Sequence, residues 1–187
     1  MEHPTLFMLL LGCRPPGRNT EQHDVFFGIA NSVKELVPAI KQFWPEAKGS
    51  VHVDAWRKVT AVNGYRVQVL PRAAGEEAAE KERLFFVNLG GYKAGEFDEF
   101  HYKILLVARS KAEAMQQARQ TAFYKHTGFK GAPAHVDDKF GVDVDELYQV
   151  KDLLPEPVKQ LYRLQLSAST ALAPDELHLG YFKLNKL

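Results

Sequence analysis

Four short polar pairs are the part of this sequence best suited to chemistry. Two have the pattern Glu-x-His and two the pattern His-x-Asp, so each pair places an imidazole two residues from a carboxylate. In an extended backbone, residues i and i+2 point to the same side of a strand, so both members of a pair face one region. The pairs are Glu21 and His23, His52 and Asp54, Glu99 and His101, and His135 and Asp137.

Imidazole and carboxylate groups together suit a divalent transition metal such as Zn, Mn, Fe or Ni, and they also suit general acid and base work. The structural alternative is that each carboxylate orients a histidine, because a buried imidazole needs a hydrogen-bond partner. The sequence contains no HExxH pattern, and its single cysteine excludes a cysteine-rich metal site. The pairs therefore do not indicate a particular reaction. We treat all eight residues as candidate ligand-binding or metal-binding residues and assign no catalytic residue.

The pairs recur because the sequence contains an internal repeat, which we interpret as a tandem duplication of one unit. At an offset of 78 residues the identities include Gly12 with Gly90, Glu21 with Glu99, and His23 with His101. At an offset of 83 residues they include His52 with His135 and Asp54 with Asp137. The change of offset indicates a five-residue insertion in the second copy.

Each copy predicts the order strand, strand, helix, strand, strand. Continuous apolar runs indicate buried strands, Ser-x-x-Glu indicates a capping box at a helix start, and Asn63-Gly64 indicates a hairpin turn. The first helix is expected to end before Pro45, and the second to continue to about His126. The predicted strands are residues 6–11, 25–30, 50–56 and 65–70 in copy one, and 84–89, 103–108, 134–138 and 146–150 in copy two.

This order predicts an α+β protein of β-grasp-like units, in which one helix packs across a mixed sheet of four strands. The second and third strands of such a sheet lie on opposite edges, so Glu21 and His23 should lie far from His52 and Asp54 within a unit. A shared site would then need the other copy. The predicted parts are unit one at 5–70, a charged connector at 71–83, unit two at 84–154, and a C-terminal helix and strand extension at 155–187.

Composition limits the partners. The chain of 187 residues has a net charge of +1 and no basic surplus, which argues against a nucleic-acid partner. The apolar run at 6–13 resembles the apolar segment and cysteine of a bacterial lipoprotein signal. However, no Lys or Arg precedes it, and a similar run recurs inside the chain at 84–90. We therefore expect a buried strand and no association with a membrane. The single Cys13 predicts a reducing compartment, the cytoplasm. A small molecule, a protein partner or a homodimer all fit this composition.

Four longer blocks resemble a known family. LFMLLLGCRPPGRNTEQHDVFFG, SVHVDAW, LFFVNLGGY with the following FDEFHYK, and TAFYKHTGFKGAPAHVDDKFGVDVD are similar to a bacterial family, domain of unknown function 1543, over about residues 5–155. That family is described as carrying one or two copies of its domain, which implies two tandem copies here. The resemblance implies a bacterial, cytoplasmic protein, and supplies no activity, cofactor or catalytic residue.

Three hypotheses follow for the function. The leading one is a protein that binds a small ligand or a metal through the Glu-x-His and His-x-Asp groups. The second is a protein-interaction module that recruits a partner at a sheet edge, with structural His–carboxylate networks. The third is a hydrolase or isomerase that uses a His–carboxylate pair, so whether the protein is an enzyme stays open. The spatial relation of the four pairs distinguishes these hypotheses.

Overall fold

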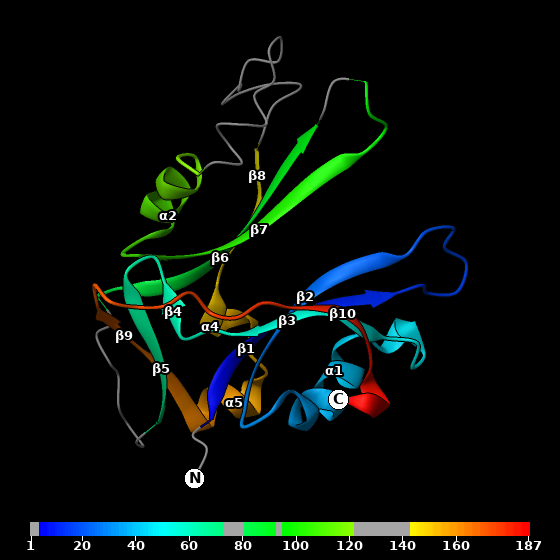
Figure 1. The fold of residues 1–187 in the computed structure, drawn as a ribbon, viewed down its shortest axis with the longest axis horizontal. Helices are drawn as coiled ribbons and strands as arrows, with labels where there is room; N and C mark the ends of the chain where they lie inside the picture. The colour runs from blue at the N-terminus through cyan, green and yellow to red at the C-terminus, as the bar shows by residue number, and fades with distance from the viewer. Residues whose placement is uncertain (1–3, 73–80, 93–94, 122–142) are drawn as a thin grey trace. The chain divides into compact units, whose positions relative to one another are not determined.

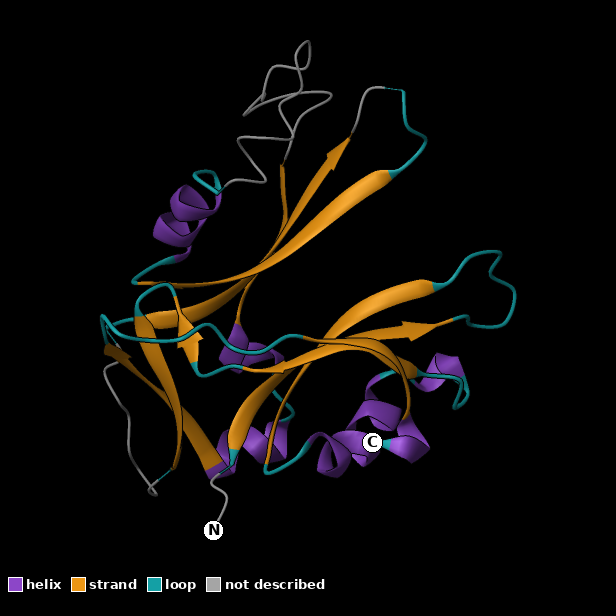
Figure 2. Ribbon diagram, viewed as in Figure 1, coloured by secondary structure: helices purple, strands orange, loops and turns teal. Residues whose placement is uncertain are grey.

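The computed structural model describes residues 4–72, 81–92, 95–121 and 143–187. The chain divides into two compact units: unit 1 consists of Met1–Glu76 and Leu153–Leu187, and unit 2 consists of Glu77–Asp152. Short helices lie beside sheets in which each described pair of strands is antiparallel (Figures 1 and 2). The protein is therefore of the α+β class.

The main sheet of unit 1 has four strands in the order β10-β3-β1-β2. The apolar run at 6–11 forms a largely buried strand, as predicted, and this strand lies between β3 and β2. The strands are β1 (Thr5–Cys13), β2 (Gln22–Ala30), β3 (His52–Lys58) and β10 (His178–Lys183).

One face of this sheet packs on the helical segment that follows β2. Phe7, Leu9 and Leu11 alternate along β1 and are at most 1% exposed, and they share a core with Leu36 and Ile40. Alternation places Met8, Leu10 and Gly12 on the opposite face. The helical segment consists of the 3-10 helix η1 (Val33–Leu36), α1 (Val37–Phe43) and the 3-10 helix η2 (Pro45–Ala47).

A second sheet of unit 1 has the order β4-β5-β9. The predicted hairpin turn is confirmed, because Asn63 and Gly64 adopt positive φ angles of 33° and 85° between β4 and β5. The C-terminal segment also belongs to unit 1, since β9 pairs with β5 and β10 pairs with β3. The remaining elements are β4 (Ala61–Val62), β5 (Tyr65–Pro71), α5 (Glu156–Leu161), β9 (Tyr162–Ala168) and η3 (Leu184–Lys186).

The predicted mixed β-grasp sheet is wrong for unit 1. The third strand, β3, pairs directly with β1, and it does so antiparallel. The predicted fourth strand, residues 65–70, lies in the other sheet. Hydrophobic patterning shows that a strand is buried and does not show which strands are its neighbours, so it could not distinguish these arrangements.

Unit 2 contains a three-stranded sheet in the order β7-β6-β8. Val87 and Leu89 of β6 are fully buried and pack with Ala118 of α2. The second helix is shorter than predicted: it ends at Ala118, and residues 119–121 are not helical. The rest of the predicted range, up to about residue 126, lies outside the described residues. The elements are β6 (Arg83–Tyr92), β7 (Glu99–Ala108), α2 (Lys111–Ala118), β8 (Asp143–Gln149) and α4 (Val150–Leu153).

The capping box of α2 is confirmed in its main feature. The backbone N–H of Glu113 donates to the hydroxyl of Ser110 at 3.2 Å. The carboxylate of Glu113 reaches back by one residue more than predicted and accepts from the backbone N–H of Arg109 at 2.8 Å. Both bonds satisfy backbone donors that would otherwise lack a partner at the helix start.

The corresponding box of unit 1 is only half formed. Ser32 makes no side-chain cap, whereas the carboxylate of Glu35 accepts from the backbone N–H of Asn31 at 3.0 Å. The first turn here is a 3-10 helix, which is wound more tightly than the α-helical turn that a capping box requires.

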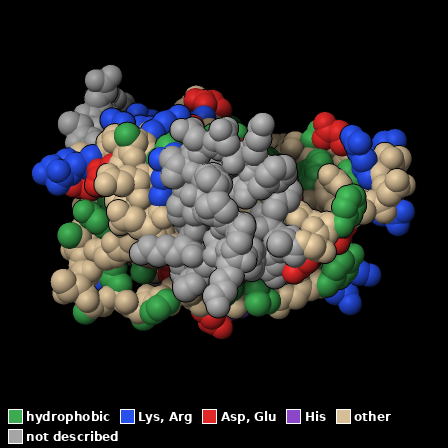
Figure 3. Space-filling view, turned by 90° about the horizontal axis from the view of Figure 1, so that it is seen from above, with side chains coloured by type: hydrophobic (Ala, Val, Ile, Leu, Met, Phe, Trp, Pro, Cys, Tyr) green, Lys and Arg blue, Asp and Glu red, His purple; other side chains and the backbone are tan. Residues whose placement is uncertain are grey.

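The surface carries charges of both signs. On the face seen in Figure 3, basic, acidic and apolar side chains lie beside one another in the described part of the chain. None of the described helices has the length and apolar character needed to cross a membrane.

Candidate functional site

The predicted pairs of unit 1 meet on one row across the main sheet. Gly12 of β1 lies opposite His23 of β2 and opposite His52 of β3. Cross-strand partners point to the same face of an antiparallel sheet, so both imidazoles stand over the same glycine. This is the face opposite the helices, and it brings together residues that the predicted β-grasp order had kept apart.

A bulge in β3 completes the arrangement. Leu10 pairs with Ala55 and Leu11 pairs with Val53, so Asp54 is an extra residue with no partner on β1. A bulge of this kind changes the direction of a side chain and locally increases the strand twist. Asp54 thereby comes within reach of both histidines.

The four side chains converge at short distances. Nε2 of His52 lies 3.1 Å from Oε1 of Glu21 and 3.1 Å from Oδ1 of Asp54. Nε2 of His23 lies 3.3 Å from Oδ2 of Asp54 and 3.8 Å from Oε2 of Glu21. Each carboxylate therefore spans the two imidazoles, and the expectation that these pairs lie far apart within a unit is wrong.

His52 is the buried member of this cluster and lacks hydrogen bonds. Its side chain is 6% exposed, whereas the side chains of His23 and Glu21 are 43% and 45% exposed. Within the described part of the chain, neither ring nitrogen of His52 makes a hydrogen bond, and neither does Oδ2 of Asp54. The two carboxylate oxygens at 3.1 Å are thus near enough to Nε2 for a hydrogen bond but do not have the direction of one. The ring therefore lacks the partner that a buried polar group usually has.

Gly12 makes room for the cluster. A β-carbon at this position would overlap Nε2 of His52 and Oδ2 of Asp54. The absence of a side chain at Gly12 of β1 thus lets the groups from the two flanking strands, β2 and β3, approach each other.

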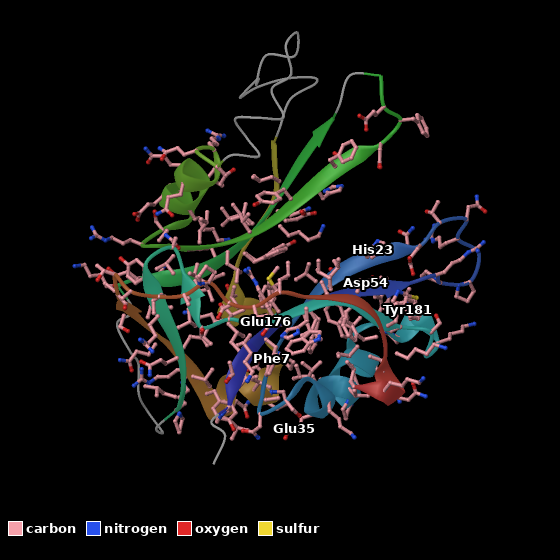
Figure 4. The ribbon with its side chains drawn as sticks, viewed as in Figure 1. Phe7, His23, Glu35, Asp54, Glu176 and Tyr181 are labelled. Carbon is pink, nitrogen blue, oxygen red and sulfur yellow. The ribbon has the colours of Figure 1, made fainter. Side chains whose placement is uncertain are left out.

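Tyr181 of β10 forms a wall beside the buried histidine. Its ring centroid lies 4.1 Å from that of His52, with the planes 33° apart, while the tyrosine stays 65% exposed. His23, Asp54 and Tyr181 lie toward the same end of the unit 1 sheet (Figure 4). We did not predict Tyr181 as a site residue, since the sequence contains no signal that places the C-terminal strand beside β3.

In unit 2 the equivalent Glu-x-His pair has different neighbours. Nε2 of His101 lies 3.8 Å from Oε2 of Glu99, the same separation as between His23 and Glu21. The side-chain nitrogen of Asn88 donates to Glu146 at 2.7 Å and lies 3.1 Å from Nδ1 of His101. An amide nitrogen only donates, so Nδ1 accepts and the neutral ring carries its proton on Nε2, the nitrogen that a metal would need.

The register of β8 places a different residue type opposite the central glycine of unit 2. Asp143 lies opposite Gly90, as His52 lies opposite Gly12. A register shift follows at the same point of both central strands, between Asn88 and Leu89 and between Leu10 and Leu11. On this register Asp143, rather than His135, is the counterpart of His52; His135 and Asp137 lie outside the described residues.

The cluster of unit 1 has the residue types of a metal site, but its side chains do not all point toward one common position. Ligand atoms about 2.1 Å from a tetrahedral ion lie about 3.4 Å apart, which is close to the four separations of 3.1–3.8 Å. Among the described residues, no group of three or more His, Cys, Asp or Glu side chains forms a ready-made metal site. Binding would therefore require the exposed pair, Glu21 and His23, to turn.

Comparison with protein families gives one match within this region. A family model described as Domain of Unknown Function (DUF1543) matches residues 18–69. The matched segment contains Glu21, His23, His52 and Asp54, and it covers one copy of the domain. A comparison with curated proteins gives no match.

The fold has a counterpart among solved structures. The crystal structure of a protein Il1583 from Idiomarina loihiensis superimposes with a TM-score of 0.65 at 24% identity. The superposition covers 97% of this chain and 98% of that chain. The two proteins thus share a fold over nearly their whole lengths.

Proposed function

We propose that unit 1 binds a divalent transition metal ion through Glu21, His23, His52 and Asp54. The observation that carries this proposal is the buried imidazole of His52, whose Nε2 lies 3.1 Å from two carboxylates without a hydrogen bond to either. Imidazole nitrogen and carboxylate oxygen form the mixed ligand set that Zn²⁺ and its neighbours prefer.

Electrostatics also supports an ion at this position. Two carboxylates that face the same pair of imidazoles repel each other, and a cation between them removes that repulsion. A divalent ion would balance both negative charges and give Nε2 of His52 a partner. The side chains of Glu21 and His23 are 45% and 43% exposed, which leaves them room to turn toward the ion.

Metal analysis of the protein purified without a histidine tag tests the proposal. We expect about one zinc or cobalt ion per chain after loading and dialysis. His23→Ala should remove this binding and leave the fold intact, because His23 is 43% exposed. The matched control is His101→Ala in unit 2, which should bind as the wild type does. Wild-type protein that binds no more metal than His23→Ala would contradict the proposal.

We further propose that the two units arose by duplication. Both contain a hairpin, a helix and a third strand that pairs with the first. Both place a glycine opposite the histidine of a Glu-x-His pair, and both have a register shift at the same point. A structure of the separately expressed unit 2 that does not superimpose on the β1–β2–β3 portion of unit 1 would argue against a common origin.

We propose a reducing compartment, the cytoplasm of a bacterium, as the location of the protein. Cys13 is the single cysteine, is fully buried, and forms no disulfide. Fractionation of the native host should recover the protein with cytoplasmic markers, and recovery from the periplasm would contradict this location.

A protein-interaction role is the second candidate, and the C-terminal strand supports it. Strand β10 lies at the edge of the main sheet, and three apolar residues in or beside it are 57–69% exposed. These residues are Leu177, Leu179 and Tyr181. If a partner docks here, Leu179→Asp should abolish its binding without changing metal content; unchanged partner recovery would reject this candidate.

A further inference from the structure

The C-terminal strand β10 changes register where it passes the cluster. Lys183 pairs with His52 and Phe182 pairs with Val53, whereas Leu179 pairs with Ala55, so the register shifts between them. Gly180 lies inside this shift with φ at +153°, a conformation that L side chains rarely adopt. A β-carbon there would also press on the ring of Phe182 at 3.3 Å.

This shift gives neighbouring residues of β10 separate roles. Phe182 packs against the buried core that contains Val53. Tyr181 instead lies against the ring of His52, and Lys183 is the cross-strand partner of the same histidine. The row across the sheet therefore reads Lys183, His52, Gly12 and His23, with side chains on one face.

Lys183 places a positive charge beside the proposed ion. It is exposed and forms no ion pair with the described residues, although its row contains the cluster with two carboxylates. A divalent ion balances the charges of Glu21 and Asp54, so these carboxylates no longer offset the positive charge of Lys183 on the same row. Such a site attracts anions.

We propose that the metal centre of unit 1 binds a small oxyanion, with Lys183 as its cationic contact and Tyr181 as the adjoining wall. This inference rests on the proposed metal function. One anion oxygen becomes a fifth ligand of the ion, which it reaches from the solvent side, where Glu21 and His23 are 45% and 43% exposed. A second oxygen meets the ammonium group of Lys183, a compact charge suited to phosphate or carboxylate.

Cobalt-loaded protein provides a direct test, because the visible absorbance of bound Co²⁺ responds to a new ligand. Inorganic phosphate and succinate are titrated separately, and the tighter of the two identifies the phosphate or the carboxylate class. Lys183→Met should weaken the binding of that anion about tenfold while the cobalt content stays at the wild-type value. The matched control is Lys186→Met, which removes an exposed lysine in η3 and should bind as the wild type does.

Two results would overturn the inference in different ways. Lys183→Met protein that holds cobalt and binds both anions as tightly as the wild type would reject the oxyanion site and leave the metal function standing. Wild-type protein that takes up no cobalt would reject the proposed function, and this inference with it.

Discussion

Units 1 and 2 contain the same Glu-x-His pair at the same separation of 3.8 Å, but their third strands and central strands give the pair different partners. In unit 1 the third strand brings His52 and Asp54 to the pair. In unit 2 the amide of Asn88 occupies Nδ1 of the histidine. The position of Asn88 on the central strand corresponds to Leu10 in unit 1, which has no polar group.

The comparison shows that the same pair of residue types can have different neighbours in the two units. An amide donor at Nδ1 favours the neutral ring that carries its proton on Nε2, and only an unprotonated nitrogen can bind a metal. Asn88 supplies such a donor to His101 in unit 2. The two units therefore provide a matched experiment within one chain.

The largest expected effect comes from removing the carboxylate of one pair at a time. Glu21→Ala should weaken zinc binding by more than about 100-fold, because even outer-sphere partners of a metal contribute about 10–100-fold. Glu99→Ala should leave zinc affinity unchanged. Isothermal titration with zinc measures both, and equal losses in the two variants would show that the units do not differ as described.

Gly12→Ala should destabilise unit 1 by about 1–3 kcal/mol. The added methyl group overlaps His52 and Asp54, so two side chains of a packed site must move. The variant should also lose zinc, because the same two residues are ligands in the proposal. Urea denaturation and zinc titration report the two effects, and a variant with wild-type values in both would remove the steric role assigned to this glycine.

Asn88→Leu gives unit 2 the residue found in unit 1. In the wild type, long-range ¹H–¹⁵N NMR should show His101 protonated on Nε2 and unprotonated on Nδ1. In the variant, the ratio of the two neutral forms should shift about fivefold toward protonation on Nδ1, since the net worth of one hydrogen bond is about 1 kcal/mol. A wild-type ring already protonated on Nδ1 would contradict the assigned hydrogen bond.

The smallest effect concerns the helix starts. Ser110→Ala should destabilise unit 2 by about 0.5–1 kcal/mol, because it removes the acceptor for the backbone N–H of Glu113. Ser32→Ala should change stability by less than about 0.3 kcal/mol, since Ser32 makes no such bond. Thermal denaturation of the two variants checks the difference, and the reverse order would show that the caps are misassigned.

Much of the local structure could be predicted from the sequence. The buried strands at 6–11 and 25–30, the turn at Asn63-Gly64 and the helix start at Ser110 depend on patterns that lie within a few residues. The candidate residues of unit 1 also follow from local spacing. Which of them meet was beyond that reasoning, because strand pairing is decided by contacts between distant segments.

Three features of the site explain where the sequence was insufficient. The bulge at Asp54 has no marker in residue types, because it depends on the register between β1 and β3. Tyr181 reaches His52 from a strand far along the chain. The segments Val51-His52-Val53-Asp54 and Val142-Asp143-Val144-Asp145 also align as Val-x-Val-Asp, and the sequence does not indicate that Asp143 lies opposite Gly90.

The placement of β9 and β10 in unit 1 has a consequence for how the protein is made. The ribosome releases β1, β2 and β3 first, then all of unit 2, and only afterwards the strands that pair with β5 and β3. Unit 2 can fold before β9 and β10 of unit 1 have been synthesised, since domains generally fold as their residues emerge. The histidine cluster therefore lacks the contact with Tyr181 until β10 has emerged after unit 2.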